Sequence, residues 1–268
     1  MDFEFKIEHF RTLDSTSSYL QRSLEMQPHT LNPGIWQVCS ADYQTAGRGQ
    51  RGNTWTSGAS ENLLFSILFR PKALLASGQF VLTEIFSLAM VDFFARQGVK
   101  TSIKWPNDIY AGERKICGML FENSLSEGLV STSIVGIGVN LNQTEFDSSI
   151  ANPTSLALET GKAVDRMQSL SELLGVLRTR YENFANGNVS RDALHTEYLS
   201  KLFRFGEFHK FQKLVAGSDP INVSYAENAF GNVIEARISN VKENGLLVLE
   251  NREGREIEFA FKEVKFLL

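Results

Sequence analysis

Cysteine and histidine are scarce in this chain of 268 residues, which contains two of the first and four of the second. Cys39 and Cys117 fit neither a disulfide framework nor a four-ligand metal site, so a reducing compartment, the cytoplasm, is expected. The histidines lie in no recognisable constellation. The motifs CxxC, HExxH, GxxxxGK[ST] and GxSxG do not occur, which argues against a metalloprotease, a P-loop ATPase and a serine hydrolase. The sequence predicts no protein-held metal.

Blocks of like charge and long uncharged apolar runs are also missing. The net charge is −4, and no run of five or more like charges offers an electrostatic footprint for duplex DNA. The most apolar stretch, residues 79–95, is interrupted by Glu84 and Asp92, so it is expected to be a buried helix and not a membrane span. The first 15 residues lack the apolar region of a signal peptide. We therefore expect neither DNA nor a membrane as a partner.

The remaining composition, 43% apolar and 22% charged, is that of an ordinary globular protein. Hydrophobic periodicity predicts two kinds of element in the first three quarters of the chain. Buried strands are expected at 34–41, 62–70, 101–106, 115–123 and 131–141, and helices at 15–24, 79–97, 168–186 and 190–203. After residue 206 only short strand-like pieces and turns follow. The prediction is an α+β protein with a mixed-sheet domain over 1–203 and a small β module over 204–268.

A glycine-rich segment, GRGQRG at 47–52, matches the dinucleotide-binding pattern GxGxxG. The context that this pattern requires is absent, because the following residues cannot open a helix and no acidic residue stands about 20 positions on. What remains is a loop in which glycines let the backbone approach a ligand, while Arg48 and Arg51 can neutralise phosphate or carboxylate. An exposed flexible loop is the alternative interpretation.

Two further segments add polar groups at strand ends. In KWPND (104–108), Pro106 ends a strand and leaves Lys104 within the sheet, where it either reaches the surface or faces an anion. In GIGVN (136–140), the glycines allow a flat ligand to come near, and Asn140 can donate and accept at one edge of a base. Together with Arg48, these residues suit chemistry at a phosphate or an activated carboxyl group.

Five blocks carry a family resemblance: STSSYL (15–20), ADYQTAGRGQRGNTW (41–55), ENLLFSILFRP (61–71), KWPNDIYAGERKICGMLFEN (104–123) and VGIGVNLN (135–142). In this order they are similar to the biotin protein ligases. The resemblance implies a catalytic domain of the biotin/lipoate protein ligase type followed by an SH3-like β barrel. Repressor members carry a helix-turn-helix domain before the first block, and 14 residues cannot contain one, so a ligase-only form is expected. Gln50 and Asn53 replace arginines of the common bacterial loop.

The implied activity is ATP-dependent. Biotin would react with Mg²⁺-ATP to give biotinyl-5′-AMP, and a lysine of a biotin carboxyl carrier protein would then take the biotin. The resemblance assigns catalysis to Lys104 and Arg48. It assigns biotin binding to Ser15, Thr16, Gln44, Gly47, Lys104 and Gly118, and adenylate binding to Arg48, Arg51, Trp55, Lys104 and Asn140. The alternatives are a lipoate or octanoate protein ligase, and a non-catalytic ligand-binding or carrier-docking protein. An exposed edge of the catalytic sheet would allow a homodimer.

Overall fold

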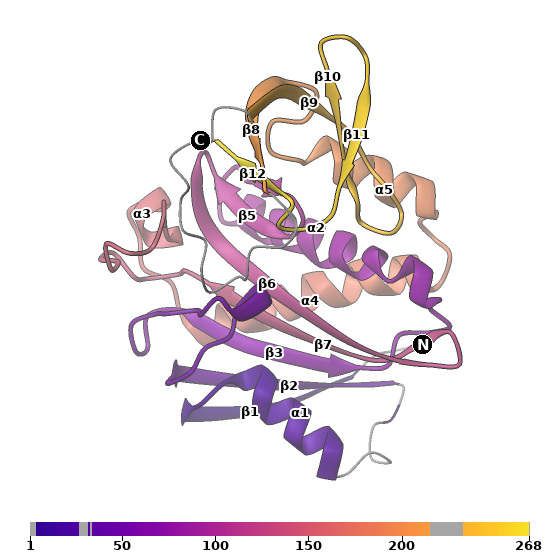
Figure 1. The fold of residues 1–268 in the computed structure, drawn as a ribbon. Coiled ribbons are helices and arrows are strands. Elements are labelled where there is room, and N and C mark those ends of the chain that lie inside the picture. The colour runs from indigo at the N-terminus through magenta and orange to yellow at the C-terminus, as the bar shows by residue number, and fades with distance from the viewer. Residues whose placement is uncertain (1–3, 27–31, 33, 215–232, 268) are drawn as a thin grey trace.

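A mixed seven-stranded sheet forms the larger part of the computed structural model, which describes residues 4–26, 32, 34–214 and 233–267 (Figure 1). Its strand order is β1-β2-β3-β7-β6-β5-β4. The strands are β1 (Glu4–Leu13), β2 (Ile35–Gln44), β3 (Leu63–Phe69), β4 (Ser102–Lys104), β5 (Asp108–Ala111), β6 (Arg114–Ser126) and β7 (Leu129–Val139). β1 and β2 run parallel, and the other neighbours are antiparallel. The predicted mixed sheet is confirmed.

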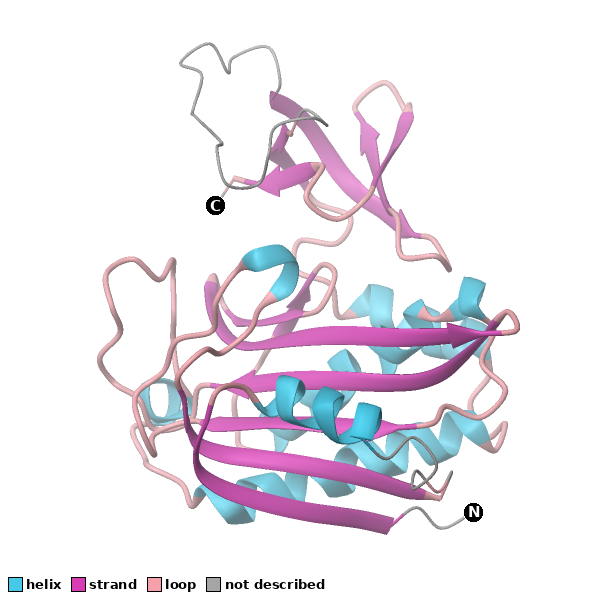
Figure 2. Cartoon of the chain, turned by 60° about the horizontal axis from the view of Figure 1, so that its bottom comes forward, coloured by secondary structure: helices cyan, strands magenta, loops and turns pink. Residues whose placement is uncertain are grey.

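Helices cover both faces of this sheet. Figure 2 shows α1 (Thr16–Met26) in front of the strands and the longer helices behind them. Those behind are α2 (Phe80–Arg96), α4 (Arg166–Ala185) and α5 (Arg191–Ser200), and a short α3 (Leu156–Thr160) follows β7. The segment 76–96 is apolar and long enough to cross a membrane by composition, but 78% of it is buried inside the fold. It is the predicted buried helix.

An aromatic stack ties the sheet to the helices behind it. The ring centroids of Trp36 on β2 and Phe69 on β3 lie 4.5 Å apart, and Phe86 of α2 lies 5.9 Å from Phe69. Tyr181 of α4 meets Trp36 edge-on at 5.0 Å. Such aromatic pairs add to the free energy gained from burial alone, so the phenylalanine-rich composition is explained by one continuous core.

Two strands lie outside the predicted set. β1 is an edge strand with no fully buried side chain, and six of its ten residues are exposed, so no buried apolar run marks it in the sequence. β5 occupies a segment that its turn-forming residues marked as a loop, and it is only four residues long. Both strands extend the sheet at its margins, and the central strands agree with the prediction.

The C-terminal part forms a second, antiparallel sheet of order β11-β10-β9-β8-β12. Its strands are β8 (Phe208–Lys213), β9 (Val233–Val241), β10 (Leu247–Asn251), β11 (Glu256–Phe259) and β12 (Val264–Phe266). The two end strands do not pair within the described ranges, so the closed barrel that the resemblance implies is not seen there. The Trp105 indole N–H donates to the Gly245 carbonyl oxygen at 3.1 Å, which joins this sheet to the larger one. The domain boundary at residue 203 stays a prediction.

Candidate active site

Three glycines leave a patch of one face of the central sheet with few side chains. Gly118 on β6 is the register partner of Gly138 on β7, and Gly136 pairs with Leu120 two residues further along. A Cβ atom at Gly136 would lie 3.5 Å from Ser66 Oγ and 3.7 Å from Ser17 Cβ, which places this glycine beside the start of α1. We call Gly118, Gly136 and Gly138 the glycine floor. It is a flat surface on which a ligand can approach the backbone closely.

Buried hydroxyl groups line one end of the glycine floor. Ser15, Thr16 and Ser17, at the start of α1, are each at most 3% exposed. The Thr16 backbone N–H donates to Gln44 Oε1 at 2.7 Å, and the Thr16 hydroxyl lies 2.7 Å from the Ser66 hydroxyl. Three residues that the resemblance assigns to the biotin ring, Ser15, Thr16 and Gln44, are therefore brought together. Hydroxyl and amide groups can both donate and accept, which suits a cyclic urea in a partly apolar pocket.

The loop after β2 folds back on itself above this face. The Trp55 N–H donates to the Gly47 carbonyl oxygen at 2.9 Å, and the Gly49 N–H donates to the Asn53 carbonyl oxygen at 2.8 Å. A short 3-10 turn, Gln50–Gly52, forms the tip. A Cβ atom at Gly47 would lie only 2.3 Å from the Trp55 carbonyl oxygen, so this position requires glycine. The side chain of Arg51 lies outside the described part of the chain.

The indole of Trp55 rests on the glycine floor. A Cβ atom at Gly138 would lie 2.3 Å from the ring, and one at Gly118 would lie 2.8 Å from it. The Lys115 ammonium is 5.7 Å from the ring centroid. The indole N–H is buried and has no hydrogen-bond partner among the described residues. Trp55, which the resemblance assigns to the adenylate, thus contacts Gly118, which the resemblance assigns to biotin, and also Gly138.

Lys115 was missed by the sequence analysis. Its ammonium pairs with the Asp108 carboxylate at 2.8 Å, and it would lie 3.1 Å from a Cβ atom at Gly118. In a regular strand, residues three apart point to opposite faces. The pairing of β5 with β6 contains an irregularity, because Tyr110 pairs with Lys115 while Ile109 pairs with Cys117. This local change brings the lysine to the glycine floor, and the signal that could have found it is its place in the family block 104–123, three residues before Gly118.

Lys104 ends β4 as the register partner of Asp108, the residue that pairs with Lys115, and its assignment to the biotin carboxylate and the phosphate stays a prediction. Its ammonium donates to the Tyr110 hydroxyl at 3.0 Å and lies 5.5 Å from the centroid of the Phe266 ring in the C-terminal sheet. Burial lowers the pKa of Lys104, and the nearby Asp108 carboxylate opposes this shift. The structure therefore puts Lys104 at the junction of the two sheets and Lys115 beside the glycine floor.

Arg48 and Asn140 both have partners within the protein. The Arg48 guanidinium forms two hydrogen bonds to the Glu122 carboxylate, at 2.5 and 3.1 Å. Asn140 is buried at the end of β7, and its amide nitrogen donates to the Thr154 carbonyl oxygen at 2.9 Å. One donor of Asn140 is thus committed to the fold. Its assignment to adenine stays a prediction.

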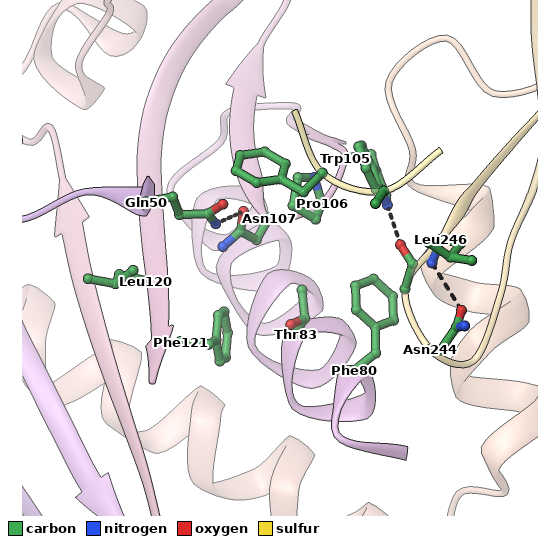
Figure 3. A pocket seen from close by; sticks show the side chains of 13 residues that line it. Gln50, Phe80, Thr83, Trp105, Pro106, Asn107, Leu120, Phe121, Asn244 and Leu246 are labelled. Carbon is green, nitrogen blue, oxygen red and sulfur yellow. Dashed lines mark hydrogen bonds between the residues drawn. The ribbon is translucent and has the colours of Figure 1, made fainter. Parts of the chain in front are cut away.

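A cavity of about 380 Å³ adjoins the tip of the loop (Figure 3). It lies between α2, the 105–107 turn and the 244–246 loop of the C-terminal sheet. Gln50 points into it, and its amide nitrogen donates to Asn107 Oδ1 at 2.7 Å. Gln50, which stands where related loops have arginine, therefore has a structural partner of its own.

Comparisons with known proteins show which proteins this chain is similar to. Residues 10–140 match the model of the "Biotin/lipoate A/B protein ligase family". The biotin--[acetyl-CoA-carboxylase] ligase of Paracoccus denitrificans is 34% identical over 253 residues, which cover 91% of this chain and 95% of that protein. The bifunctional ligase/repressor BirA of Escherichia coli (strain K12) is 30% identical over 216 residues. That match covers 78% of this chain but only 62% of the relative.

A solved structure extends the similarity to the whole fold. The biotin protein ligase from Aquifex aeolicus, in complex with biotin and ATP, superimposes with a TM-score of 0.74. The two proteins are 26% identical, and the superposition covers 98% of this chain and 99% of that one. The similarity therefore includes both sheets.

Proposed function

This chain belongs to the biotin protein ligase family, and from that premise we propose that it activates biotin with ATP and transfers it to a lysine of a biotin carboxyl carrier protein. The observation that carries the proposal is the arrangement of the glycine floor. Hydroxyl and amide groups lie at one end of it, and the Lys115 ammonium lies at the other. A ligand with a polar ring, an apolar chain and a terminal carboxylate fits this order of surfaces.

The first step joins two anions. A carboxylate oxygen of biotin attacks the α-phosphorus of ATP, the bond from that phosphorus to the bridging oxygen breaks, and pyrophosphate leaves. Lys115 would reduce the repulsion between carboxylate and phosphate, because a fixed ammonium stabilises the charge that builds during the exchange. Asp108 would hold this ammonium in place through the 2.8 Å ion pair. Arg48 pairs with Glu122 beyond the other end of the floor, so its assignment to the phosphate stays an expectation from the family resemblance.

The second step releases AMP. The acceptor lysine, as a neutral amine, attacks the biotinyl carbonyl carbon, the bond to the phosphate oxygen breaks, and the nitrogen loses a proton as the amide forms. The protein's contribution is orientation and exclusion of water by the loop above the floor. Mg²⁺ would enter with ATP as its counter-ion, since magnesium commonly binds through phosphates and one or two carboxylates.

Transfer to a purified carrier domain tests the proposal. The protein is incubated with biotin, Mg²⁺-ATP and the carrier, and the carrier mass is measured. We expect a gain of one biotinyl group, lost when the acceptor lysine is changed to arginine. Lipoate and octanoate are run in parallel. A carrier modified by either of these and not by biotin would overturn the proposal in favour of a lipoate or octanoate ligase, and no modification at all would overturn it outright.

A further inference from the structure

One ion pair joins the loop to the sheet beyond the glycine floor. Arg48 meets Glu122 through both terminal nitrogens, so the planar guanidinium is fixed in orientation as well as in position. Glu122 lies on β6 four residues after Gly118, and the alternation of a strand puts both on the same face. The exposed fractions of the two side chains are 43% for Arg48 and 31% for Glu122. The pair is therefore open to solvent and not part of the core.

Two other contacts of the loop also fall on β6, in addition to those with Asn107 and with Gly138 on β7. The Gln50 amide nitrogen lies 3.3 Å from the Met119 carbonyl oxygen, and the Trp55 ring covers Gly118. Within the loop, the hydrogen bond from Trp55 to Gly47 closes a ring of backbone that contains Arg48. Holding Arg48 in place therefore restrains Trp55 as well. The segment 47–55 therefore contacts β6 at Gly118, Met119 and Glu122.

We propose that Glu122 is a positioning residue of the ligase reaction: its carboxylate holds Arg48, and through it the segment 47–55, across the glycine floor. This inference rests on the proposed function. A guanidinium carries five N–H donors, and Glu122 engages one on each terminal nitrogen. The remaining donors stay available to a ligand that lies on the glycine floor. Glu122 thereby orients the arginine and slows the movement of the segment 47–55 away from the glycine floor, so the intermediate is retained until the carrier arrives.

A purely structural role makes a different prediction. Half-exposed ion pairs contribute little to global stability, and β5 pairs with β6 only as far as Cys117, so Glu122 lies on a stretch where β7 is the paired neighbour. Loss of the carboxylate should therefore leave the melting temperature nearly unchanged. Loss of the carboxylate should destabilise only the segment 47–55.

Amide hydrogen exchange tests the ion pair between Arg48 and Glu122 without any ligand. The amides of Gly49 and Trp55 are hydrogen-bonded within the segment 47–55. In Glu122→Gln, they should exchange about two- to fivefold faster than in the parent, as expected for loss of a half-exposed ion pair. Glu127→Gln is the matched control, because Glu127 is exposed at the tip of the same hairpin and makes no ion pair within the described ranges. Unchanged exchange in Glu122→Gln would overturn the inference whether or not the protein makes an adenylate.

The rate at which the intermediate is released tests the function of the ion pair between Arg48 and Glu122. Preformed biotinyl-5′-AMP should dissociate about two- to fivefold faster from Glu122→Gln, while the affinity for biotin alone stays at the parent value. Glu122→Asp keeps the charge and should recover most of the parent rate. A parent-like release rate in Glu122→Gln would also overturn the inference. If the parent protein forms no adenylate, the proposed function is wrong. Hydrogen exchange alone would then test whether Glu122 holds Arg48 and the segment 47–55.

Discussion

Gly138→Ala should disable the site while leaving the protein folded. The new Cβ atom would stand 2.3 Å from Cε2 of Trp55 and 2.6 Å from Cζ2. Carbon atoms in contact are about 3.5 to 4.0 Å apart, so the indole must move by more than about 1 Å. Overpacking of this kind costs about 1 to 3 kcal/mol of folding free energy, and replacing a strand glycine by alanine returns about 0.5 to 1 kcal/mol. The net loss is therefore about 2 kcal/mol or less, within the stability of an ordinary domain.

The catalytic effect should be much larger than this loss. A displacement of about 1 Å at a site can cost roughly 10²-fold in rate, and we expect a decrease of this order in biotinyl-5′-AMP formation. The rate is measured by single-turnover quenching, and folding by circular dichroism and thermal melting. Gly175→Ala in α4 is the matched control, since a Cβ atom there meets nothing within 4 Å and helices favour alanine. A folded Gly138→Ala protein with the parent rate would refute the assignment of the glycine floor as the reacting surface.

Three other changes probe the site and the fold. Lys115→Met should lower the rate of adenylate formation by about 10² to 10³ while the protein stays folded, and by more than Lys104→Met does; equal losses in quenched-flow rates would contradict the different positions of the two lysines. The Arg22 guanidinium, together with the Ser15 N–H, lowers the pKa of Asp14 to about 2, so this carboxylate stabilises the fold above about pH 4, its unfolded pKa, and the effect is lost as the pH falls through 2. Urea unfolding of the parent and of Asp14→Asn should therefore differ at pH 5 and converge near pH 2, and a constant difference would be contrary evidence. Gly245→Ala should lower the melting temperature by several degrees more than Gly254→Ala. Both glycines have positive φ, but only a Cβ atom at Gly245 would meet Phe80 of α2, at 2.6 Å. Equal shifts of the two variants in differential scanning calorimetry would show that the contact between Gly245 and Phe80 is unimportant.

The central strands could be predicted because their sequence periodicity is set by burial. The runs that became β3 and β7 are bounded by turn residues and are buried on both faces, and the run that became α2 is apolar all round because it lies at the centre of the core. β1 and β5 escaped prediction for the opposite reason. An exposed edge strand keeps its charged residues, and a strand of four residues is too short to show a period.

The sequence could predict which residues belong to the site, but not where all of their side chains lie. Ser15, Thr16 and Gln44 are brought together as the family blocks imply, because the start of α1 packs beside the end of β2. Lys115 lies in the family block 104–123, but the face to which it points depends on the pairing irregularity between β5 and β6. The Arg48 to Glu122 pair joins residues 74 positions apart. Contacts of that separation depend on the register of the whole sheet, and one sequence alone does not supply it.

Biotin-dependent exchange between ATP and labelled pyrophosphate tests the central claim most directly. The reaction reports reversible formation of the acyl adenylate and needs no carrier protein. The account predicts that label enters ATP only when biotin and Mg²⁺ are both present, and that Lys115→Met abolishes nearly all of this exchange. Exchange that is equally fast without biotin, or that Lys115→Met leaves at the parent rate, would contradict the claim that the glycine floor and its lysine activate biotin.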